Sequence, residues 1–269
     1  IGDFAEPFAT RALCAMMGLS HEHWPFIADR ANTVGYALSV SIKEDIERID
    51  VAVQELYEFV DQLIRERKAE PGQDVVSRLV QFSEAGDKLT DAELRNALVL
   101  MLFGGMDTTR NQLGLILQTY MRNPDQWELL AERPEEFAKP ALEEALRANP
   151  TTRWVTREAN EDFEYQGLQI EKGTTVHLFT MSSGTDPEAY PDPEINIEAE
   201  GRKPHHTFGG GMHHCLGHYI ARADMSVALP MLAESFTDIS CPGGDTWLPD
   251  SGNHGPIRLP ITVAVRERA

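Results

Sequence analysis

The sequence predicts a mostly α-helical fold with small β-sheets, and three observations indicate this class. Apolar residues recur at helical spacing through most of the first two thirds of the chain. Thr90 and Glu93 form a capping box, the start signal of a helix whose pattern continues without a break to Pro124. Alternation typical of strands is confined to short segments, chiefly 163–179 and 256–267.

The amino-terminal part of the chain is expected to form four helices. The longest of them stops before Pro71 and Gly72, which end helices readily. Its apolar face is predicted to consist of Ile46, Val51, Val53, Leu56, Val60 and Leu63. The four helices are expected at 6–19, 23–38, 42–70 and 74–84.

The long central helix and the elements after it complete the prediction. Leu89 precedes the capping box, in the position of a hydrophobic staple. Segment 163–179 has the alternation of a small hairpin with a glycine turn, and 256–267 that of a further strand. After the central helix, more helices are expected at 124–131, 134–148 and 215–229, the last interrupted at Pro230.

Composition narrows the classes of partner. The chain has 269 residues, 42% of them hydrophobic, which is enough to bury a core. It carries 43 acidic and 24 basic side chains, a formal net charge of −19. A surface this negative repels nucleic acid and anionic lipid, so neither is expected as a partner. The most apolar run, 97–106, is too short to span a bilayer, so no membrane segment is expected.

The cysteines point to a reducing compartment. Cys14, Cys215 and Cys241 are odd in number and far apart, which argues against a disulfide framework. With no signal peptide visible, a cytoplasmic location is expected. Since the chain begins at Ile1 rather than at a methionine, we also expect an amino-terminal segment to be missing from it.

Two adjacent glycines interrupt the central helix in the segment FGGMDTTR, residues 103–110. They cost roughly 2 kcal/mol relative to alanine, so a structural or functional reason is expected for them. One interpretation is close packing by another helix. The other is a groove in which something flat approaches the backbone, with Asp107 and Thr108 as an acid and an alcohol that relay protons beside it.

The segment HHTFGGGMHHCLGH, residues 205–218, has three interpretations. A phosphate loop is disfavoured because the Gly-Lys-Ser/Thr ending and a preceding strand are missing. Zinc is conceivable, since His214 and His218 are four apart and Cys215 or His213 could add a ligand, but no second ligand pair exists elsewhere. The third interpretation makes Cys215 the sole protein ligand of a haem iron, with glycines that let a flat macrocycle approach.

A helix beginning at Cys215 would support the third interpretation. The positive end of a helix lowers a thiol pKa and so favours the thiolate that a haem iron requires. On this basis we expect the helix 215–229 to start at the cysteine itself.

The motif around the cysteine resembles that of a known family. Phe208, Gly211, His213, Cys215 and Gly217 fit the signature Phe-x-x-Gly-x-His-x-Cys-x-Gly of the cytochrome P450 haem-thiolate monooxygenases. The chain is therefore identified as similar to soluble bacterial members of that family. Further matches in the right order are GGMDT at 104–108, Glu144 and Arg147 in EEALR, Arg157, DPEAYPDP at 186–193 and ARAD at 221–224.

The resemblance implies a fold and a cofactor. Residues 1–269 would be a single haem-binding domain, the middle and carboxyl-terminal portion of a cytochrome P450 fold that is incomplete at the amino terminus. The cofactor would be haem b, iron protoporphyrin IX, with the Cys215 thiolate as axial ligand. Contacts to it are expected from Gly104, Gly105, Arg157, Phe208, Gly211, His213 and Gly217, with Arg157 and His213 at the propionates.

The resemblance also assigns roles away from the cysteine. Asp107 and Thr108 would be the catalytic acid and alcohol, and Glu144 with Arg147 a buried structural pair. Arg153 beside Trp154 would suit an aromatic or carboxylate-bearing substrate, although Arg153 could equally bind a propionate or face solvent. The substrate pocket is expected to include Leu98, Met101, Leu102, Gly105, Thr152, Arg153, Trp154 and Val155.

The function that the resemblance implies is oxidation of a small organic molecule by dioxygen. Electrons would come from a separate ferredoxin or flavodoxin-type donor, since no flavin or iron–sulfur motif is present. Arg202, Lys203 and Arg222 could form a docking patch for it, or be ordinary solvated charges. The alternatives are a peroxide-using or rearranging haem-thiolate enzyme and a truncated, non-catalytic haem- or zinc-binding protein.

One departure from the family pattern is visible. Segment 193–201 has no arginine where members often carry one that completes a network with the Glu-x-x-Arg pair. We therefore expect Glu144 and Arg147 to lack this third partner.

Overall fold

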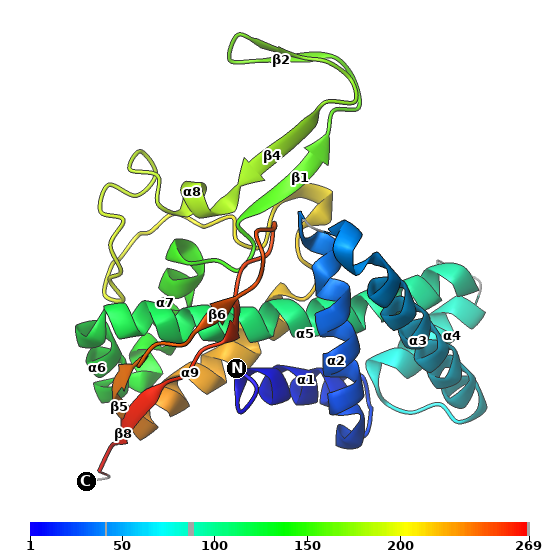
Figure 1. Cartoon of the computed structure of the whole chain (residues 1–269), viewed down its shortest axis with the longest axis horizontal. Coiled ribbons are helices and arrows are strands. Elements are labelled where there is room, and N and C mark those ends of the chain that lie inside the picture. Colours follow the sequence, from blue (N-terminus) through cyan, green and yellow to red (C-terminus); the bar gives the residue numbers. More distant parts are fainter. Residues whose placement is uncertain (41, 86–88, 268–269) are drawn as a thin grey trace.

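The long helix α5, Asp91–Arg122, crosses the molecule and carries most other elements along its length (Figure 1). The structure, a computed structural model, describes residues 1–40, 42–85 and 89–267. The predicted capping box starts α5: the Thr90 hydroxyl accepts from the Glu93 N–H at 3.2 Å, and the Glu93 carboxylate accepts from the Thr90 N–H at 2.8 Å. The start signal predicted from the sequence is confirmed.

Four helices pack near the amino-terminal half of α5 (Figure 1). They are α1 (Ala5–Met16), α2 (Trp24–Gly35), α3 (Ile42–Ala69) and α4 (Val75–Glu84). Their shared core contains Cys14, Ile27, Leu56, Val60, Leu63, Val80, Leu94, Leu98, Leu102 and Met106.

The predicted apolar face of α3 is partly wrong. Ile46 and Val51 are 50% and 58% exposed. Ile49 and Ala52 are buried instead, because they continue the three- and four-residue spacing of Leu56, Val60 and Leu63 toward the amino terminus.

A second group surrounds the carboxyl-terminal half of α5. It contains α6 (Pro124–Glu132), α7 (Pro134–Ala148) and α9 (His218–Ser235). Pro230 does not interrupt α9, contrary to expectation. Its neighbours Ala228, Leu229 and Ala233 are buried in the core shared with α5, α6 and α7, and that packing offsets the missing backbone hydrogen bond.

Four two-stranded antiparallel sheets complete the described part of the chain. β1 (Trp154–Glu158) pairs with β4 (Thr175–Phe179), and the β2–β3 hairpin (Phe163–Tyr165, Leu168–Ile170) extends beyond them, away from the helices (Figure 1). Only the first half of the segment 163–179, which was predicted as one hairpin, forms a hairpin. Its second half contains β4, which pairs with β1 instead. β5 (Phe236–Ser240) pairs with β8 (Thr262–Val265), and β6 (Thr246–Trp247) with β7 (Pro256–Arg258). A short helix, α8 (Thr180–Gly184), follows β4.

The architecture is the mostly helical fold with small sheets that the sequence predicts. Among the described residues, no helix combines the length and the apolar character needed to cross a membrane.

Candidate functional site

The glycine-rich loop ends in an isolated thiol. Cys215 is partly exposed and forms no disulfide. Gly209 and Gly211 have φ of +70° and +66°, the left-handed region that glycine adopts without strain, and they fold the loop back on itself. The Cys215 N–H donates to the Phe208 carbonyl at 2.9 Å, which closes the loop around the sulfur.

The helix after this loop starts later than expected. α9 begins at His218, with Gly217 as its N-cap, so the prediction that it starts at Cys215 is wrong. A short 3₁₀ turn at Gly211–His213 and the extended ψ of 137° at His214 delay the helix. Cys215 therefore lies three positions before the first helical residue, near the unpaired N–H groups of the first turn.

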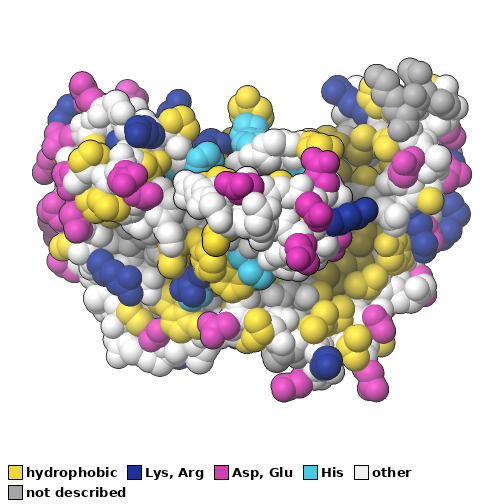
Figure 2. All heavy atoms as spheres, turned by 90° about the horizontal axis from the view of Figure 1, so that it is seen from above, with side chains coloured by type: hydrophobic (Ala, Val, Ile, Leu, Met, Phe, Trp, Pro, Cys, Tyr) yellow, Lys and Arg dark blue, Asp and Glu magenta, His cyan; other side chains and the backbone are white. Residues whose placement is uncertain are grey.

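The surface around Cys215 is unusually apolar for an exposed loop. Met212 is 95% exposed and Leu216 is 88% exposed, and nothing lies within 4 Å of a side chain built at Gly210 or Gly211. Figure 2 shows histidine and hydrophobic side chains near the middle of one face, with acidic groups scattered among them. His213 is exposed in the same loop. These features suit a loop that is covered by an apolar group.

The two central glycines of α5 face different surroundings. A side chain at Gly105 would meet Leu13 of α1 at 2.9 Å, so Gly105 serves helix packing, in contrast to the cofactor and pocket contacts expected for it. Gly104 faces open space, since nothing lies within 4 Å of a side chain there. Helical spacing puts Met101 and Thr108 on the Gly104 face, and the Thr108 hydroxyl donates to the Gly104 carbonyl at 2.9 Å.

Asp107 is buried in a network of polar side chains. It is 2% exposed and accepts hydrogen bonds from Arg110 at 3.2 Å, Asn111 at 3.3 Å and Asn253 at 3.3 Å. Burial raises the pKa of Asp107, and these three donors together with the Arg110 charge oppose the rise. Arg110 also lies 3.6 Å from Glu6 of α1, which extends the network toward the surface.

A small cavity borders Asp107. Its volume is about 10 Å³, close to the space that one water requires. Together with Asp107, it is lined by Gly35, Tyr36, Ser39, Leu248, Pro249, Ser251 and Asn253.

The predicted substrate-pocket residues do not form one group. Leu98 and Leu102 are fully buried in the core with α1–α4, so their expected place in the pocket is wrong: Leu94, Leu98, Leu102 and Met106 form one stripe along α5. Met101 is only partly buried.

The remaining predicted pocket residues lie at the start of β1, all partly buried. The Thr152 hydroxyl donates to the Asn253 side chain at 3.2 Å. Val155 is paired with Leu178 of β4, and Trp154 packs against Phe179 with ring centroids 5.8 Å apart. Arg153 continues the same segment.

Arg157 lies farther along β1. It is opposite Val176 of β4 and lines a surface cleft of about 360 Å³ together with Val176, Leu178 and Phe163. Its Nη1 donates to the Thr156 carbonyl at 2.9 Å, which leaves the rest of the guanidinium available to a ligand.

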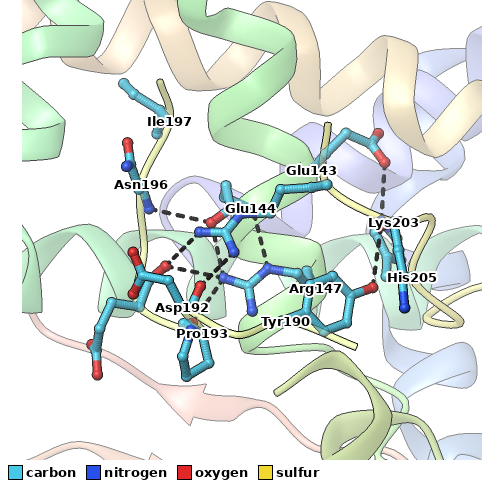
Figure 3. Close-up of polar contacts among 12 residues, drawn as sticks. Glu143, Glu144, Arg147, Tyr190, Asp192, Pro193, Asn196, Ile197, Lys203 and His205 are labelled. Carbon is cyan, nitrogen blue, oxygen red and sulfur yellow. Dashed lines mark hydrogen bonds and ion pairs between the residues drawn. The ribbon is translucent and has the colours of Figure 1, made fainter. Parts of the chain in front are cut away.

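Glu144 and Arg147 form a buried two-point ion pair on α7 (Figure 3). Arg147 Nε donates to Glu144 Oε1 at 2.9 Å and Nη2 donates to Oε2 at 2.8 Å. Their side chains are 2% and 8% exposed. Arg147 also donates to the carbonyls of Gly184 at 2.7 Å and Pro193 at 2.9 Å, so the pair holds α8 and the following loop against α7.

A third charge completes this network, contrary to expectation. Arg202 Nε lies 2.9 Å from Glu144 Oε1. Sequence inspection of 193–201 missed it because the arginine follows one residue after that window. Its signal is plain in retrospect: Arg202 is the only arginine between Arg157 and Arg222.

Glu143, next to this pair, anchors the cysteine loop to α7. It accepts from His205 Nε2 at 2.9 Å and from Arg222 Nε at 2.6 Å. Burial alone would raise the pKa of Glu143, but His205 and Arg222 outweigh it and lower the pKa to about 2. The Arg222 guanidinium also lies 4.3 Å from the ring centre of Phe208.

These ion pairs reduce the number of unpaired positive charges in the docking patch expected at Arg202, Lys203 and Arg222. Arg202 and Arg222, two of its three cations, are used by Glu144 and Glu143. Only Lys203 remains an exposed charge at that position.

The comparisons with known proteins decide the family. The cytochrome P450 family model matches residues 20–263. The chain belongs to the cytochrome P450 family.

Curated relatives agree with this assignment. Luteothin monooxygenase of Streptomyces thioluteus is 32% identical over 96% of this chain and 64% of that protein. Nocardicin C N-oxygenase of Nocardia uniformis subsp. tsuyamanensis is 31% identical over 97% of this chain and 66% of that protein. The chain thus spans about two thirds of the length of these P450 relatives.

Solved structures show the same fold. The crystal structure of CalO2 superimposes with a TM-score of 0.89 at 28% identity, over 97% of this chain and 66% of that one. The predicted cytochrome P450 fold is therefore confirmed.

The residues present fit the haem-thiolate group of a P450. Cys215 offers a free, accessible sulfur, the loop before it leaves open space, and Gly104 leaves open space on α5. The described residues contain no group of three His, Cys, Asp or Glu side chains that could hold a metal ion.

Proposed function

We propose that the chain is the haem-binding part of a P450 monooxygenase that uses dioxygen to oxidise a small organic molecule. The observation that carries this proposal is the free thiol of Cys215, which is partly exposed in a glycine loop. The apolar side chains of this loop, Met212 and Leu216, are exposed to solvent. Haem b, when bound, would supply the redox chemistry, and the Cys215 thiolate would hold its iron.

Asp107 and Thr108 would deliver protons. Burial raises the pKa of Asp107, which allows this carboxyl to hold a proton closer to neutral pH than an exposed aspartate does. The small cavity beside it has room for about one water. The Thr108 hydroxyl lies on the open Gly104 face and would pass the proton to a reacting group there.

Arg157 and His213 would hold the propionates of the cofactor. Arg157 on β1 has guanidinium N–H groups that are free to bind an anion, and the exposed His213 in the cysteine loop can donate a hydrogen bond to one. Phe208, Gly211 and Gly217 would shape the loop that holds the macrocycle, and Gly104 would leave room for it on α5. The predicted pocket residues that are partly exposed, and so remain available to a substrate, are Met101, Thr152, Arg153, Trp154 and Val155.

Electrons would come from a separate ferredoxin or flavodoxin-type protein. The chain contains no flavin or iron–sulfur motif that could supply them. A reducing compartment such as the cytoplasm suits all three cysteines, which are free in the structure.

A carbon-monoxide difference spectrum of the reduced protein, with a haem assay on the same sample, tests the proposal. We expect a red-shifted, thiolate-type Soret band that Cys215→Ser abolishes. Cys241→Ser is the matched control, because Cys241 is exposed and far from the glycine loop in sequence, and it should keep the band. A protein without haem, or a Cys215→Ser variant with an unchanged band, would contradict the assignment.

A further inference from the structure

Arg153 is a half-buried cation without a counter-ion among the described residues. Its Nε is fully buried and has no hydrogen-bond partner there, and none of the ion pairs found involves its guanidinium. Asp250 is the one acid whose charge acts on it, but Asp250 is exposed and not in ion-pair contact. A charge taken out of water costs free energy unless a partner compensates it.

Two other arginines with largely buried side chains, Arg110 and Arg202, differ from Arg153 because each is paired with a carboxylate. Arg110 donates through Nη2 to Asp107 and Asn111, and Arg202 donates to the carbonyls of Asp192 and Glu194. Both therefore have their charge compensated within the described part of the chain. Arg153 has no such side-chain bonds among the described residues.

The backbone holds Arg153 in a fixed place. Its N–H donates to the Gly252 carbonyl at 2.8 Å, and its carbonyl accepts from the Met181 N–H at 3.3 Å. The preceding Thr152 is bonded to Asn253 at 3.2 Å. A side chain on so constrained a backbone is presented to a ligand with little loss of conformational entropy.

The face of β1 that carries Arg153 is the one expected to meet the cofactor and substrate. Alternation along a strand puts Arg153, Val155 and Arg157 on one face, flanked by Val176 and Leu178 of β4. Arg157, four residues on, lies roughly 13 Å farther along the strand. Arg153 and Arg157 therefore lie at opposite ends of this face of the strand.

The Arg153 end of the face is the end linked to the proposed proton relay. Asn253, which bonds to Thr152, also donates to Asp107 at 3.3 Å. Arg157 lies at the opposite end, by the surface cleft. Arg153 thus lies at the end of the strand that is tied to the Asp107 network, and Arg157 at the end that borders the surface cleft.

We propose that Arg153 binds the carboxylate of an organic-acid substrate and so selects acids over neutral molecules of the same shape. The inference rests on the proposed function, because it assigns a substrate class to that site. A guanidinium offers two parallel N–H donors that match a carboxylate, which a lysine or an amide does not. The same carboxylate chemistry could come from a haem propionate, and the experiment separates these two sources.

The test is isothermal titration calorimetry of the haem-loaded protein with aryl and alkyl carboxylates, among them 4-phenylbutyrate and decanoate, each paired with its primary amide. We expect acids to bind about 10- to 100-fold tighter than their amides, the range for a charge-assisted hydrogen bond. Arg153→Gln should remove this preference and Arg153→Lys should retain part of it. Arg78→Gln, the same change at an exposed position of α4, should keep the full preference.

Each outcome bears on one source of the carboxylate. Unchanged haem content in Arg153→Gln with loss of the acid preference supports the substrate role. Loss of haem with the preference intact would assign Arg153 to a propionate and overturn the proposal, as would equal binding of all acids and amides to the unaltered protein. Because calorimetry detects binding without a haem signal, the same titration of haem-free protein separates failure here from failure of the haem-thiolate assignment.

Discussion

The side-chain amide of Asn253 donates a hydrogen bond of 3.3 Å to the carboxylate of Asp107, a residue 146 positions earlier in the chain. The same side chain accepts from the Thr152 hydroxyl at 3.2 Å. One asparagine therefore joins three segments: the loop before β7, the middle of α5 and the start of β1.

Replacing this asparagine should loosen all three segments. Asn253→Ala is expected to lower the free energy of unfolding by about 1–3 kcal/mol, because the buried Asp107 loses a donor. It should also raise the pKa of Asp107 further, since the lost hydrogen bond opposes the effect of burial. Urea denaturation measures the first effect, with Asn160→Ala at an exposed position as the control. Equal stability of the two variants would mean that the Asn253 contacts contribute little.

The stability of the protein should depend on Glu143 in a defined pH range. The folded-state pKa of Glu143, about 2, lies below its ordinary value of 4.5. The stabilisation is therefore fully present above pH 4.5 and is lost as the pH falls toward 2. Glu143→Gln should cost about 1–3 kcal/mol at pH 7, a range reduced for the partial exposure of the carboxylate, and progressively less in acid.

Urea unfolding at pH 7 and at successive lower pH values checks this dependence. Glu135→Gln makes the same change at an exposed position of α7 and should alter the free energy of unfolding by less than about 0.5 kcal/mol. A difference between Glu143→Gln and the unaltered protein that stays constant down to pH 2 would contradict the assigned ion pairs.

The two arginines on Glu144 should differ in their contribution. Arg147→Ala removes the partner of a buried carboxylate and is expected to cost about 3–5 kcal/mol. Arg202→Ala should cost less, because its side chain is 17% exposed and that of Arg147 is 2% exposed. If Arg147→Ala does not fold, Arg147→Lys keeps the charge and allows the comparison. Thermal unfolding that ranks Arg202 above Arg147 would show the order to be wrong.

Gly184 should tolerate no side chain. A Cβ there would lie 2.1 Å from the Arg147 carbonyl oxygen, well inside contact distance, so α8 would have to move away from α7. Gly184→Ala is expected to destabilise the protein by about 1–3 kcal/mol or more. Gly2→Ala, where nothing lies within 4 Å, is the matched control. Similar melting temperatures for the two variants would contradict the close approach.

Local signals predicted much of the fold. The Thr90 capping box gave the start of α5, and the two-residue break at Pro71 and Gly72 gave the end of α3 to within about two residues. The prolines at 124 and 134 likewise mark the first residues of α6 and α7. These features depend on residues close together in sequence, which is why sequence alone reveals them.

The sequence-based predictions were wrong where contacts between residues far apart in the sequence determine the structure. Pro230 stays inside α9 because burial of Leu229 and Ala233 compensates for its missing N–H. Gly104 and Gly105 are equivalent in sequence, but only Gly105 meets α1. Arg202 and Asn253 reach their partners from loops, so no periodic pattern reveals them. The cysteine loop was recognisable because its residues are contiguous.

The long sequence separation between Asn253 and Asp107 has a kinetic consequence. Contacts between segments so far apart require the closure of a long loop, and they form late in folding as a rule. The helices α5, α6 and α7 can pack together first. The contacts of Asn253 with Asp107 and Thr152, which link α5 to the start of β1, form last. Substitutions at Asn253 are then expected to speed unfolding and leave the rate of folding nearly unchanged.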